Sequence, residues 1–596
     1  MPWIVARTVA QVLEATVLRL GERPALQYRV GDLWESVTWK GYRARSREVA
    51  RSLLVLGVRP GEGVAILGYN APQWVFAGVG AMLASAIPAG IYTTSSPEQV
   101  AYITDHCDAR VAFADTPAAA KKFLAARAQM PKLERVVQWS GTPVDDPMVL
   151  SWTDFLAKGE GVPESAIDER AASQKVDDPC TLIYTSGTTG NPKGVLLSHR
   201  NVSWTAEAAL ELLGLSASEE GVSYLPLSHV AEQMLTIHVP MFNGHRVTIA
   251  ESMEKLPDAL RRARPTYFLG VPRVWEKMQA KMVAAGQSAT PMRKRVVKWA
   301  RTVGLRGGYA KEQGHRPALT FRLADRLLFT KVREALGFDR LQLAVTGAAP
   351  ISKDTLEYFL SLGIPIYELY GMSECSGPAT ISTPKNFRIG KVGKIIPATE
   401  VKLAEDGEIL VKGQHVFVGY LKDPKATSEA LVDGWLHTGD VGEFDADGFL
   451  KITDRKKELI ITAGGENVAP QLIEGAIKAI PVVAQVVAIG DRRKFISALL
   501  TLDPERVLVD AAVIGSPAKT PAEAAKCSIF RAHVGAQLDA VNGHLARVQA
   551  VKKFTILPEE LTVDGGELTP TLKLRRKVIL AKYAAEIEAM YAEAEA

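Results

Sequence analysis

The segment with the clearest chemical pattern is a run of Gly, Ser and Thr that ends in a lysine, Tyr184–Gly194. It follows an apolar run and precedes another. Glycines let backbone N–H groups turn toward a phosphate, the hydroxyls add donors, and Lys193 adds a positive charge. The spacing is not that of a Walker A loop, which needs Gly directly before the lysine, where this chain has Pro192. The pattern therefore predicts a phosphate-binding loop rather than a flexible surface loop.

Around this loop, short β-rich runs alternate with helical patterns over the first three quarters of the chain. Strand and helix in alternation indicate α/β layers with largely parallel sheets. Residues 407–448 differ, because turns and short strands crowd together there, which predicts a β-rich subdomain. The β-rich runs are residues 64–70, 181–187, 246–250 and 341–347, and residues 203–215 are one of the helical patterns.

The chain is too long for one compact core, so at least two domains are expected. A change of pattern at residues 452–460 indicates the boundary. Beyond it, one helical pattern is followed by two strands, residues 482–491 and 494–502, which predicts a compact α+β domain. We therefore expect a large domain of residues 1–455 and a small domain of residues 456–596.

Composition excludes several classes of protein. The chain has 596 residues and a formal net charge of +5, which is too small for its size to predict nucleic-acid binding. Its four cysteines form no CxxC pair and no Cys/His cluster, which disfavours disulfides and zinc and fits the cytoplasm. The start has no signal-peptide pattern, and no run of about 18 apolar residues occurs that could cross a membrane.

Residues 291–340 stand apart because they hold 13 Lys and Arg against four Asp and Glu. The simpler interpretation is a solvated helical face. The alternative is a surface for anionic lipid and peripheral membrane association, since Val296, Val297 and Trp299 are interleaved with cations. The cations concerned are Arg293, Lys294, Arg295, Lys298 and Arg301.

The loop of residues 184–194 resembles the phosphate loop of the adenylate-forming superfamily, which includes acyl-CoA synthetases, firefly luciferase and the adenylation domains of peptide synthetases. The forms YGMSE…SGP and KELIITAGGENVAP are most similar to those of bubblegum-type long-chain acyl-CoA synthetases. Seven ordered motifs over most of the chain are far more specific than any one of them. The six further segments that resemble motifs of the superfamily are residues 223–233, 345–350, 367–378, 433–440, 452–470 and 566–576.

The resemblance implies a long-chain fatty acid–CoA ligase. A carboxylate is a poor acylating agent because its leaving group would be oxide. In this superfamily the carboxylate attacks the α-phosphate of ATP, which gives acyl-AMP and pyrophosphate, and a thiol then displaces AMP. Both reactants are anionic, so cations and hydrogen-bond donors must bring them together. The expected ligands are a fatty acid, ATP, magnesium and CoA, and no nucleic acid.

The resemblance also implies a nucleotide site. Tyr370 resembles the residue that stacks on adenine, with small residues opposite it. Asp440 resembles the acid that accepts both ribose hydroxyls, and Arg455 resembles a further ribose or phosphate contact. Ser373 stands where Thr is commonest in the family. The full set is Thr185, Ser186, Gly187, Thr188, Thr189, Gly190, Lys193, Gly347, Ala348, Ala349, Glu368, Leu369, Tyr370, Gly371, Met372, Ser373, Asp440, Arg455 and Lys573.

Three residues resemble the family's catalytic groups. Lys573 is similar to the lysine whose ammonium neutralises charge at the α-phosphate and holds the attacking carboxylate. Lys193 is expected at the β- and γ-phosphates, and His229 resembles the histidine beside the carboxylate site. Glu374 resembles the magnesium-binding acid, and Thr185 is a second candidate ligand, because a hard cation prefers oxygen.

In this family the small domain is mobile and adopts two orientations, one for each half-reaction. Lys457 resembles the hinge residue. A swing about it would withdraw Lys573 and bring residues 462–468 to the site. There Gly464 and Gly465 would give the backbone freedom to line a channel for the pantetheine arm of CoA.

One position departs from the long-chain pattern. Some long-chain synthetases carry a tryptophan gate shortly after the position of His229, whereas this chain continues with VAEQML. Three alternatives stay open: a ligase that loads a carrier protein, a CoA ligase for a shorter or aryl acid, and a luciferase-like oxygenase. A catalytically dead lipid-binding protein is disfavoured, since Lys193, Glu374 and Lys573 are all present.

Overall fold

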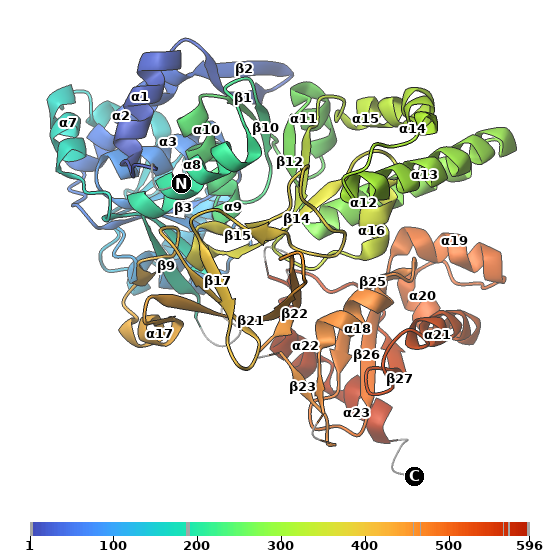
Figure 1. The fold of residues 1–596 in the computed structure, drawn as a ribbon. Coiled ribbons are helices and arrows are strands. Elements are labelled where there is room, and N and C mark those ends of the chain that lie inside the picture. Colours follow the sequence, from blue (N-terminus) through green and yellow to red (C-terminus); the bar gives the residue numbers. More distant parts are fainter. Residues whose placement is uncertain are drawn as a thin grey trace.

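The chain folds around several groups of buried side chains, and two of them mark its two parts. One extends from Val9 to Leu450, and the other from Ile460 to Ile556. The structure is a computed structural model, and Figure 1 shows the second group's elements, in orange and red, at one corner of the molecule. The residues that it describes are 4–185, 191–456, 458–464, 466–563, 565–569 and 573–592.

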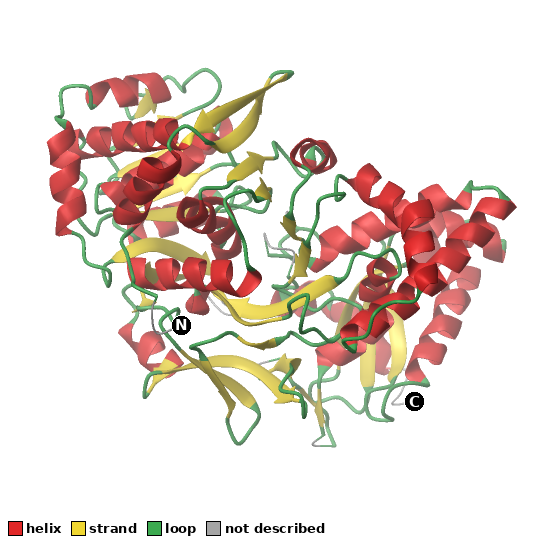
Figure 2. Ribbon diagram, turned by 45° about the horizontal axis from the view of Figure 1, so that its top comes forward, coloured by secondary structure: helices red, strands yellow, loops and turns green. Residues whose placement is uncertain are grey.

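An eight-stranded sheet forms the centre of the larger part, and helices lie on either side of its strands (Figure 2). Strands β3 to β8 pair in parallel, as the sequence predicts, whereas β9 and β19 join antiparallel at one edge. The order is β19 (Gly419–Tyr420), β9 (Lys193–Ser198), β8 (Pro179–Thr185), β4 (Ile87–Ile91), β3 (Gly63–Leu67), β5 (Val111–Ala114), β6 (Arg135–Gln138) and β7 (Val149–Ser151).

A second sheet of five strands carries several of the motif residues. Strands β13 and β14 run parallel, and their carboxyl ends lead directly into Gly347 and Ser373. In α/β sheets, ligands bind at the carboxyl ends of parallel strands. The order is β12 (Tyr267–Leu269), β13 (Leu343–Thr346), β14 (Ile366–Met372), β15 (Gly377–Ile381) and β16 (Lys394–Ile395).

The predicted β-rich subdomain is an antiparallel sheet. Its strands β21 and β22 place Asp440 and Arg455 directly opposite each other. The residues of one motif therefore face those of the next, although fourteen positions separate them. The strands are β17 (Glu400–Leu403), β18 (Glu408–Lys412), β20 (Leu431–Val432), β21 (Trp435–Phe444) and β22 (Leu450–Arg455).

The C-terminal part is the expected α+β unit. A three-stranded sheet packs against helices, and the loop before α22 (Arg576–Lys582) brings the chain back toward the larger part. Its main elements are α18 (Pro470–Ile477), β25 (Val483–Ile489), β26 (Ile496–Leu502), α21 (Ser528–Asn542) and β27 (Val551–Ile556).

Helix α13 (Pro291–Glu312) extends from the body to the edge of the molecule (Figure 1). Its second half packs unusually closely, because glycines face its neighbours. A Cβ at Gly304 would lie 2.0 Å from the carbonyl oxygen of Ser361, and one at Gly308 would lie 2.3 Å from Leu360. A Cβ at Gly307 would lie 2.2 Å from the ring of Phe321 on α14 (Leu319–Ala324). This glycine seam fixes the second half of α13 against α14 and α16 (Lys353–Leu360).

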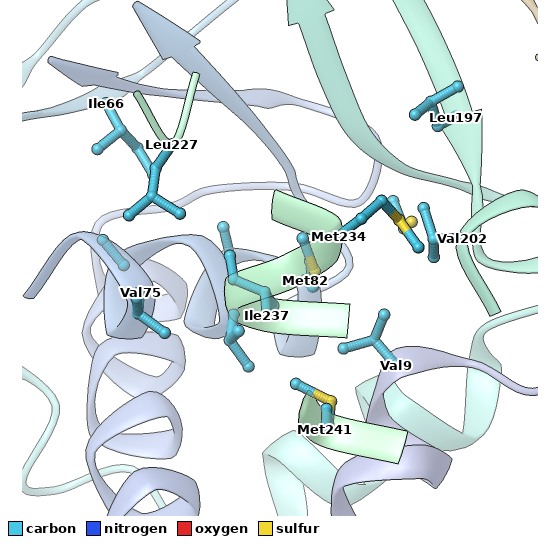
Figure 3. Packing of buried hydrophobic residues seen from close by; sticks show 14 of the residues in the cluster. Val9, Ile66, Val75, Met82, Leu197, Val202, Leu227, Met234, Ile237 and Met241 are labelled. Atoms are coloured by element: carbon cyan, nitrogen blue, oxygen red, sulfur yellow. The ribbon is translucent and has the colours of Figure 1, made fainter. Parts of the chain in front are cut away.

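The chain that follows His229 is held in the large core. Met234 and Ile237, in a turn of π-helix at residues 234–238, are buried beside Val75, Met82 and neighbouring apolar side chains (Figure 3). Single π-helical turns occur frequently at functional sites. The packing fixes the short helix before this turn, α9 (Val230–Gln233), whose N-cap is His229.

Candidate active site

Asp440 lies at the centre of a buried hydrogen-bonded group. The hydroxyl of Tyr370 donates to Oδ2 of Asp440 over 2.9 Å, and Arg455 Nε lies 3.1 Å from Oδ1. The backbone N–H of Asp440 donates to Thr438 over 3.1 Å. Burial raises the pKa of Asp440, and the nearby Arg455 guanidinium opposes that rise. The two residues expected at adenine and ribose are thus joined directly.

The wall expected on the other side of the adenine from Tyr370 is made of small residues, and other segments of the chain lie close against them. A Cβ at Gly347 would lie 2.6 Å from Leu369, and one at Gly371 would lie 1.9 Å from the carbonyl oxygen of Gly377. Ala348 adopts a φ of +69°, a left-handed conformation that L residues rarely take. Such strain occurs where the surrounding structure requires it, frequently at ligand sites. Ser373 is buried at the end of β14.

The lysine of the phosphate loop and the candidate magnesium ligand meet through one tyrosine. Lys193 Nζ lies over the ring of Tyr420, 4.7 Å from its centre, and the Tyr420 hydroxyl donates to Glu374 Oε1 over 2.8 Å. Thr185 and Lys193 are paired residues of β8 and β9, so they flank the loop on both sides. The loop residues Ser186 to Gly190 themselves lie outside the described residues.

Lys573 reaches this group from the C-terminal part. The charges of Arg455, Asp440 and Glu374 act on its ammonium, and so does that of Glu458. Burial and the Arg455 guanidinium lower the pKa of Lys573 to about 8, while the carboxylates oppose the shift. At neutral pH the side chain therefore remains an ammonium, but its proton is held less tightly than that of an ordinary lysine.

Two hydrogen bonds join Lys573 to Thr569. The backbone N–H of Thr569 donates to the carbonyl of Lys573 over 2.8 Å, and the N–H of Lys573 donates to the Thr569 hydroxyl over 3.0 Å. Three residues further on, Arg576 is only partly exposed; it forms an ion pair with Glu474 of α18 at 2.7 Å and also donates to the carbonyl of Ala488. Arg576 therefore ties the segment that follows Lys573 to the core of its own domain.

His229 is neutral in this arrangement. Its Nδ1 accepts the backbone N–H of Ala231 over 3.2 Å, so the proton of the neutral ring resides on Nε2. Burial and the ammonium of Lys573 lower the pKa of His229 to about 4. The side chain can therefore donate a hydrogen bond to an oxygen at neutral pH without carrying a charge.

Two polar side chains, Asn70 and the buried Glu232, hold the loop before His229. The Asn70 amide donates to the carbonyl of Leu225 over 2.7 Å and accepts from the N–H of Leu227 over 3.2 Å. Glu232 accepts from the N–H of Leu225 over 3.0 Å and from the Thr236 hydroxyl over 2.5 Å. Burial raises the pKa of Glu232 to about 7. These contacts fix the position of residues 225–227 and therefore that of His229, two residues further along the chain.

Other predicted residues are placed less directly. The Glu368 carboxylate accepts the N–H of Gly390 over 2.7 Å, so that side chain already has a partner. Gly464 lies in the turn between β23 (Ile460–Ile461) and β24 (Asn467–Val468). Lys457 and Gly465 lie outside the described residues.

Sequence reasoning missed Tyr420, Asn70 and Glu232. Tyr420 lies in FVGYLKDP, more than two hundred positions after Lys193, and only the pairing of β19 with β9 brings the two together. Asn70 comes from the loop after β3. Glu232 was visible in the motif at residues 223–233, where an acid among apolar residues indicates a buried partner.

The site and the fold define an enzyme that binds an adenine nucleotide. The profile of the family described as AMP-binding enzyme matches residues 13–421, and that of the AMP-binding enzyme C-terminal domain matches residues 457–595. The chain belongs to the AMP-binding enzyme family. The resemblance to adenylate-forming enzymes that the motifs indicate is confirmed.

Curated relatives cover nearly the whole chain. It is 42% identical to the long-chain-fatty-acid–CoA ligase ACSBG2 of Xenopus laevis, over 98% of this chain and 84% of the relative. It is 39% identical to the long-chain-fatty-acid–CoA ligase ACSBG1 of Homo sapiens, over 100% of this chain and 86% of the relative. The likeness to bubblegum-type synthetases is thereby confirmed as well.

Solved structures share the fold. The adenylation domain of a carboxylate reductase from Mycobacterium chelonae superposes with a TM-score of 0.79 at 22% identity, over 98% of this chain and 91% of that one. The anthranilate CoA ligase AuaEII, in complex with anthranoyl-AMP, superposes with a TM-score of 0.74 at 20% identity, over 98% of both chains. In the part of this chain that the structure describes, we find no helix of the length and apolar character that a membrane crossing requires.

Proposed function

We propose that the chain is a long-chain-fatty-acid–CoA ligase that works through an acyl-AMP intermediate. The observation that carries the proposal is the meeting of Lys573, from the C-terminal part, with Asp440, Arg455 and Glu374 of the large part. An ammonium beside a candidate ribose acid and a candidate metal ligand is what the attack of a carboxylate on an α-phosphate requires. The names of the curated relatives support the long-chain acid as substrate.

In the first half-reaction, a carboxylate oxygen of the fatty acid forms a bond to the α-phosphorus of ATP. The bond from that phosphorus to the bridging oxygen breaks, and pyrophosphate leaves. The Lys573 ammonium would neutralise charge on the α-phosphate and the attacking carboxylate, and Lys193 would hold the β- and γ-phosphates. His229 would donate its Nε2 proton in a hydrogen bond to the carboxylate oxygen that does not attack.

The nucleotide would lie between Tyr370 and the small residues at 347–349. Asp440, which already accepts from Tyr370 and pairs with Arg455, would take the ribose hydroxyls. Leu369 would support Gly347 from behind, since a Cβ at Gly347 would lie 2.6 Å from its side chain. The remaining contacts would come from the backbone of Glu368, Gly371, Met372 and Ser373 and from the loop Thr185–Gly190.

Magnesium would be held mainly by the phosphates, with Glu374 as the protein carboxylate and Thr185 as a second oxygen. This fits the site, because in the described parts of the chain no cluster of three or more His, Cys, Asp or Glu could hold the ion alone. Glu374 is only partly buried, and the Tyr420 hydroxyl engages its Oε1, which leaves Oε2 for a cation. The ion would supply charge neutralisation at the leaving pyrophosphate.

In the second half-reaction, the CoA thiol attacks the acyl carbonyl, the thiol loses its proton, and AMP leaves. We propose that residues 456–596 turn relative to residues 1–455 between the two steps, with Lys457 as the hinge. Gly464 and Gly465 would then line the path of CoA. In support, Gly464 is exposed in its turn, whereas Lys573 occupies the site in the orientation described here.

Exchange of labelled pyrophosphate into ATP, measured over a panel of carboxylic acids, tests the proposal. We expect exchange with long-chain fatty acids, followed by thioester formation when CoA is added. Exchange only with aryl or short acids would contradict the long-chain assignment. Exchange without any transfer to CoA would favour a carrier-protein ligase. We also propose a cytoplasmic enzyme that associates peripherally with membrane, and the surface involved is argued next.

A further inference from the structure

A long stretch of the chain around α12 (Pro272–Gln287) and α13 carries only one sign of charge. From Lys277 to Lys311 the sequence has nine Lys and Arg and no Asp or Glu. We call residues 277–299 the basic arm: the end of α12, the connecting turn and the first part of α13. The six cations of the arm are all exposed, and they are Lys277, Lys281, Arg293, Lys294, Arg295 and Lys298.

The arm also exposes large apolar side chains. Met292 is 69% exposed, Val296 40% and Trp299 38%. They are spaced i, i+4 and i+7, so they form one stripe along the helix. Arg293 and Arg295 fall on either side of that stripe. A helix with an apolar stripe between cations is the pattern of segments that lie in the interface of an anionic bilayer.

The cations at the tip are available for an external partner. Among the described residues, no carboxylate pairs with Arg293, Lys294, Arg295 or Lys298 in an ion pair. The sequence placed Arg301 among the cations of the candidate lipid surface, and this expectation is wrong. Its guanidinium stacks on the ring of Tyr358 at 4.4 Å and donates to Ser361 over 3.0 Å, so it belongs to the body.

The neighbouring helices repeat the pattern. Leu319, Leu323 and Leu327 are 79%, 51% and 47% exposed and follow one another at intervals of four, with Arg322 and Arg326 exposed beside them. Between these helices and the body opens a cavity of about 410 Å³. Cations and aromatic rings line much of it, among them Lys311, His315, Lys385, Phe321, Tyr367 and Phe387.

We propose that the basic arm is a docking surface for an anionic lipid bilayer, with Met292, Val296 and Trp299 inserted at the level of the headgroups and the arm's cations on lipid phosphates. The inference rests on the proposed function, because a long-chain acid partitions into bilayers and an enzyme held there meets its substrate at high local concentration. An acidic protein would match the charge, but it would leave the exposed apolar stripe without a partner.

Sedimentation with vesicles tests the surface. We expect the full-length protein to sediment with vesicles of phosphatidylglycerol and phosphatidylcholine at low salt and to dissociate as salt rises. Each cation near an anionic surface contributes about fivefold in affinity. The quadruple variant R293E/K294E/R295E/K298E should therefore bind more than about 100-fold more weakly.

A matched control carries the same change of charge elsewhere. Lys519, Lys526, Arg547 and Lys552 are exposed cations of the C-terminal domain, and reversing all four to Glu should leave vesicle binding near that of the wild type. Equal loss in both quadruple variants would overturn the arm as the surface. If the wild type stays in the supernatant at low salt, the proposal that the arm binds a membrane is wrong, and an acidic protein becomes the expected partner.

Insertion of the stripe has its own readout. Brominated lipids quench a tryptophan at headgroup depth, so vesicles that contain them should quench the wild type more than Trp299→Phe. Identical quenching of the two would overturn insertion at Trp299. Activity on detergent-solubilised fatty acid separates this proposal from the function: the arm variants should keep it, whereas its absence in the wild type would contradict the proposed function instead.

Discussion

Asp440 and Lys573 meet in one site but are positioned in different ways. Asp440 is fixed within the large part, by Tyr370 on the neighbouring sheet and by Arg455 on the paired strand. Lys573 is fixed within the small part, by Thr569 and by the Arg576–Glu474 pair nearby. Its distance from Asp440 therefore depends on where the whole small domain lies. The contacts of Asp440 lie within one part of the chain, whereas the lysine is held by a second part, which the proposed turn of the small domain would move as a unit.

Removal of Lys573 should give the largest effect. In Lys573→Ala we expect acyl-AMP formation to fall by about 1,000-fold or more, because a charge contact in the transition state is worth several kcal/mol. Thioester formation from supplied acyl-AMP should remain near the wild-type rate. Pyrophosphate exchange measures the first step and thioester release the second. Equal loss of both steps would mean that Lys573 is not confined to one half-reaction.

Glu374→Gln should give the next largest effect. The change keeps the shape of the side chain and removes its charge, so magnesium should bind about 10- to 100-fold more weakly and adenylation should slow. A magnesium titration of the exchange rate measures this. Glu357→Gln, at a half-buried acid of α16 that pairs with Lys353, serves as the control. An unchanged magnesium dependence in Glu374→Gln would remove its role as a ligand.

The pH profile of adenylation should show the proton of Lys573. The pKa of Lys573 is lowered to about 8, so the side chain is protonated and active below that pH and loses its proton above it. Adenylation kcat/KM should then fall about tenfold for each further pH unit. In Lys573→Arg the guanidinium does not titrate in this range, so the fall should be absent. A wild-type profile that stays level from pH 7 to 10 would contradict the lowered pKa.

Tyr420 should give the smallest effect. Tyr420→Phe removes the hydroxyl that donates to Glu374 but keeps the ring beneath Lys193. A hydrogen bond of this kind is worth about 1 kcal/mol net, so we expect adenylation to fall about fivefold. Tyr420→Leu also removes the ring and should fall further. If the two variants behave alike, the ring does not support Lys193.

Much of the fold was accessible from local patterns. Parallel strands, the β-rich subdomain and the C-terminal α+β unit were visible because their apolar runs and turns lie within short windows. The sequence could not show that Tyr370 donates to Asp440, since that contact joins strands of two different sheets. Nor could it show that Arg301 faces the body while Arg295 faces solvent. Adjacent cations on a helix point in different directions, and only packing decides which of them acquire partners.

The glycine seam of α13 affects the entropy of any contact made by the helix tip. Gly304, Gly307 and Gly308 hold the second half of α13 so closely that the first half leaves the body as a continuous, already ordered helix. A disordered basic tail loses backbone freedom when it meets a surface, and each side chain immobilised there costs about 0.5–1.5 kcal/mol more. The backbone of α13 has already lost this conformational entropy, because the helix forms when the protein folds. Only side chains remain to be ordered, so a short helix with few cations suffices where a flexible tail would need many.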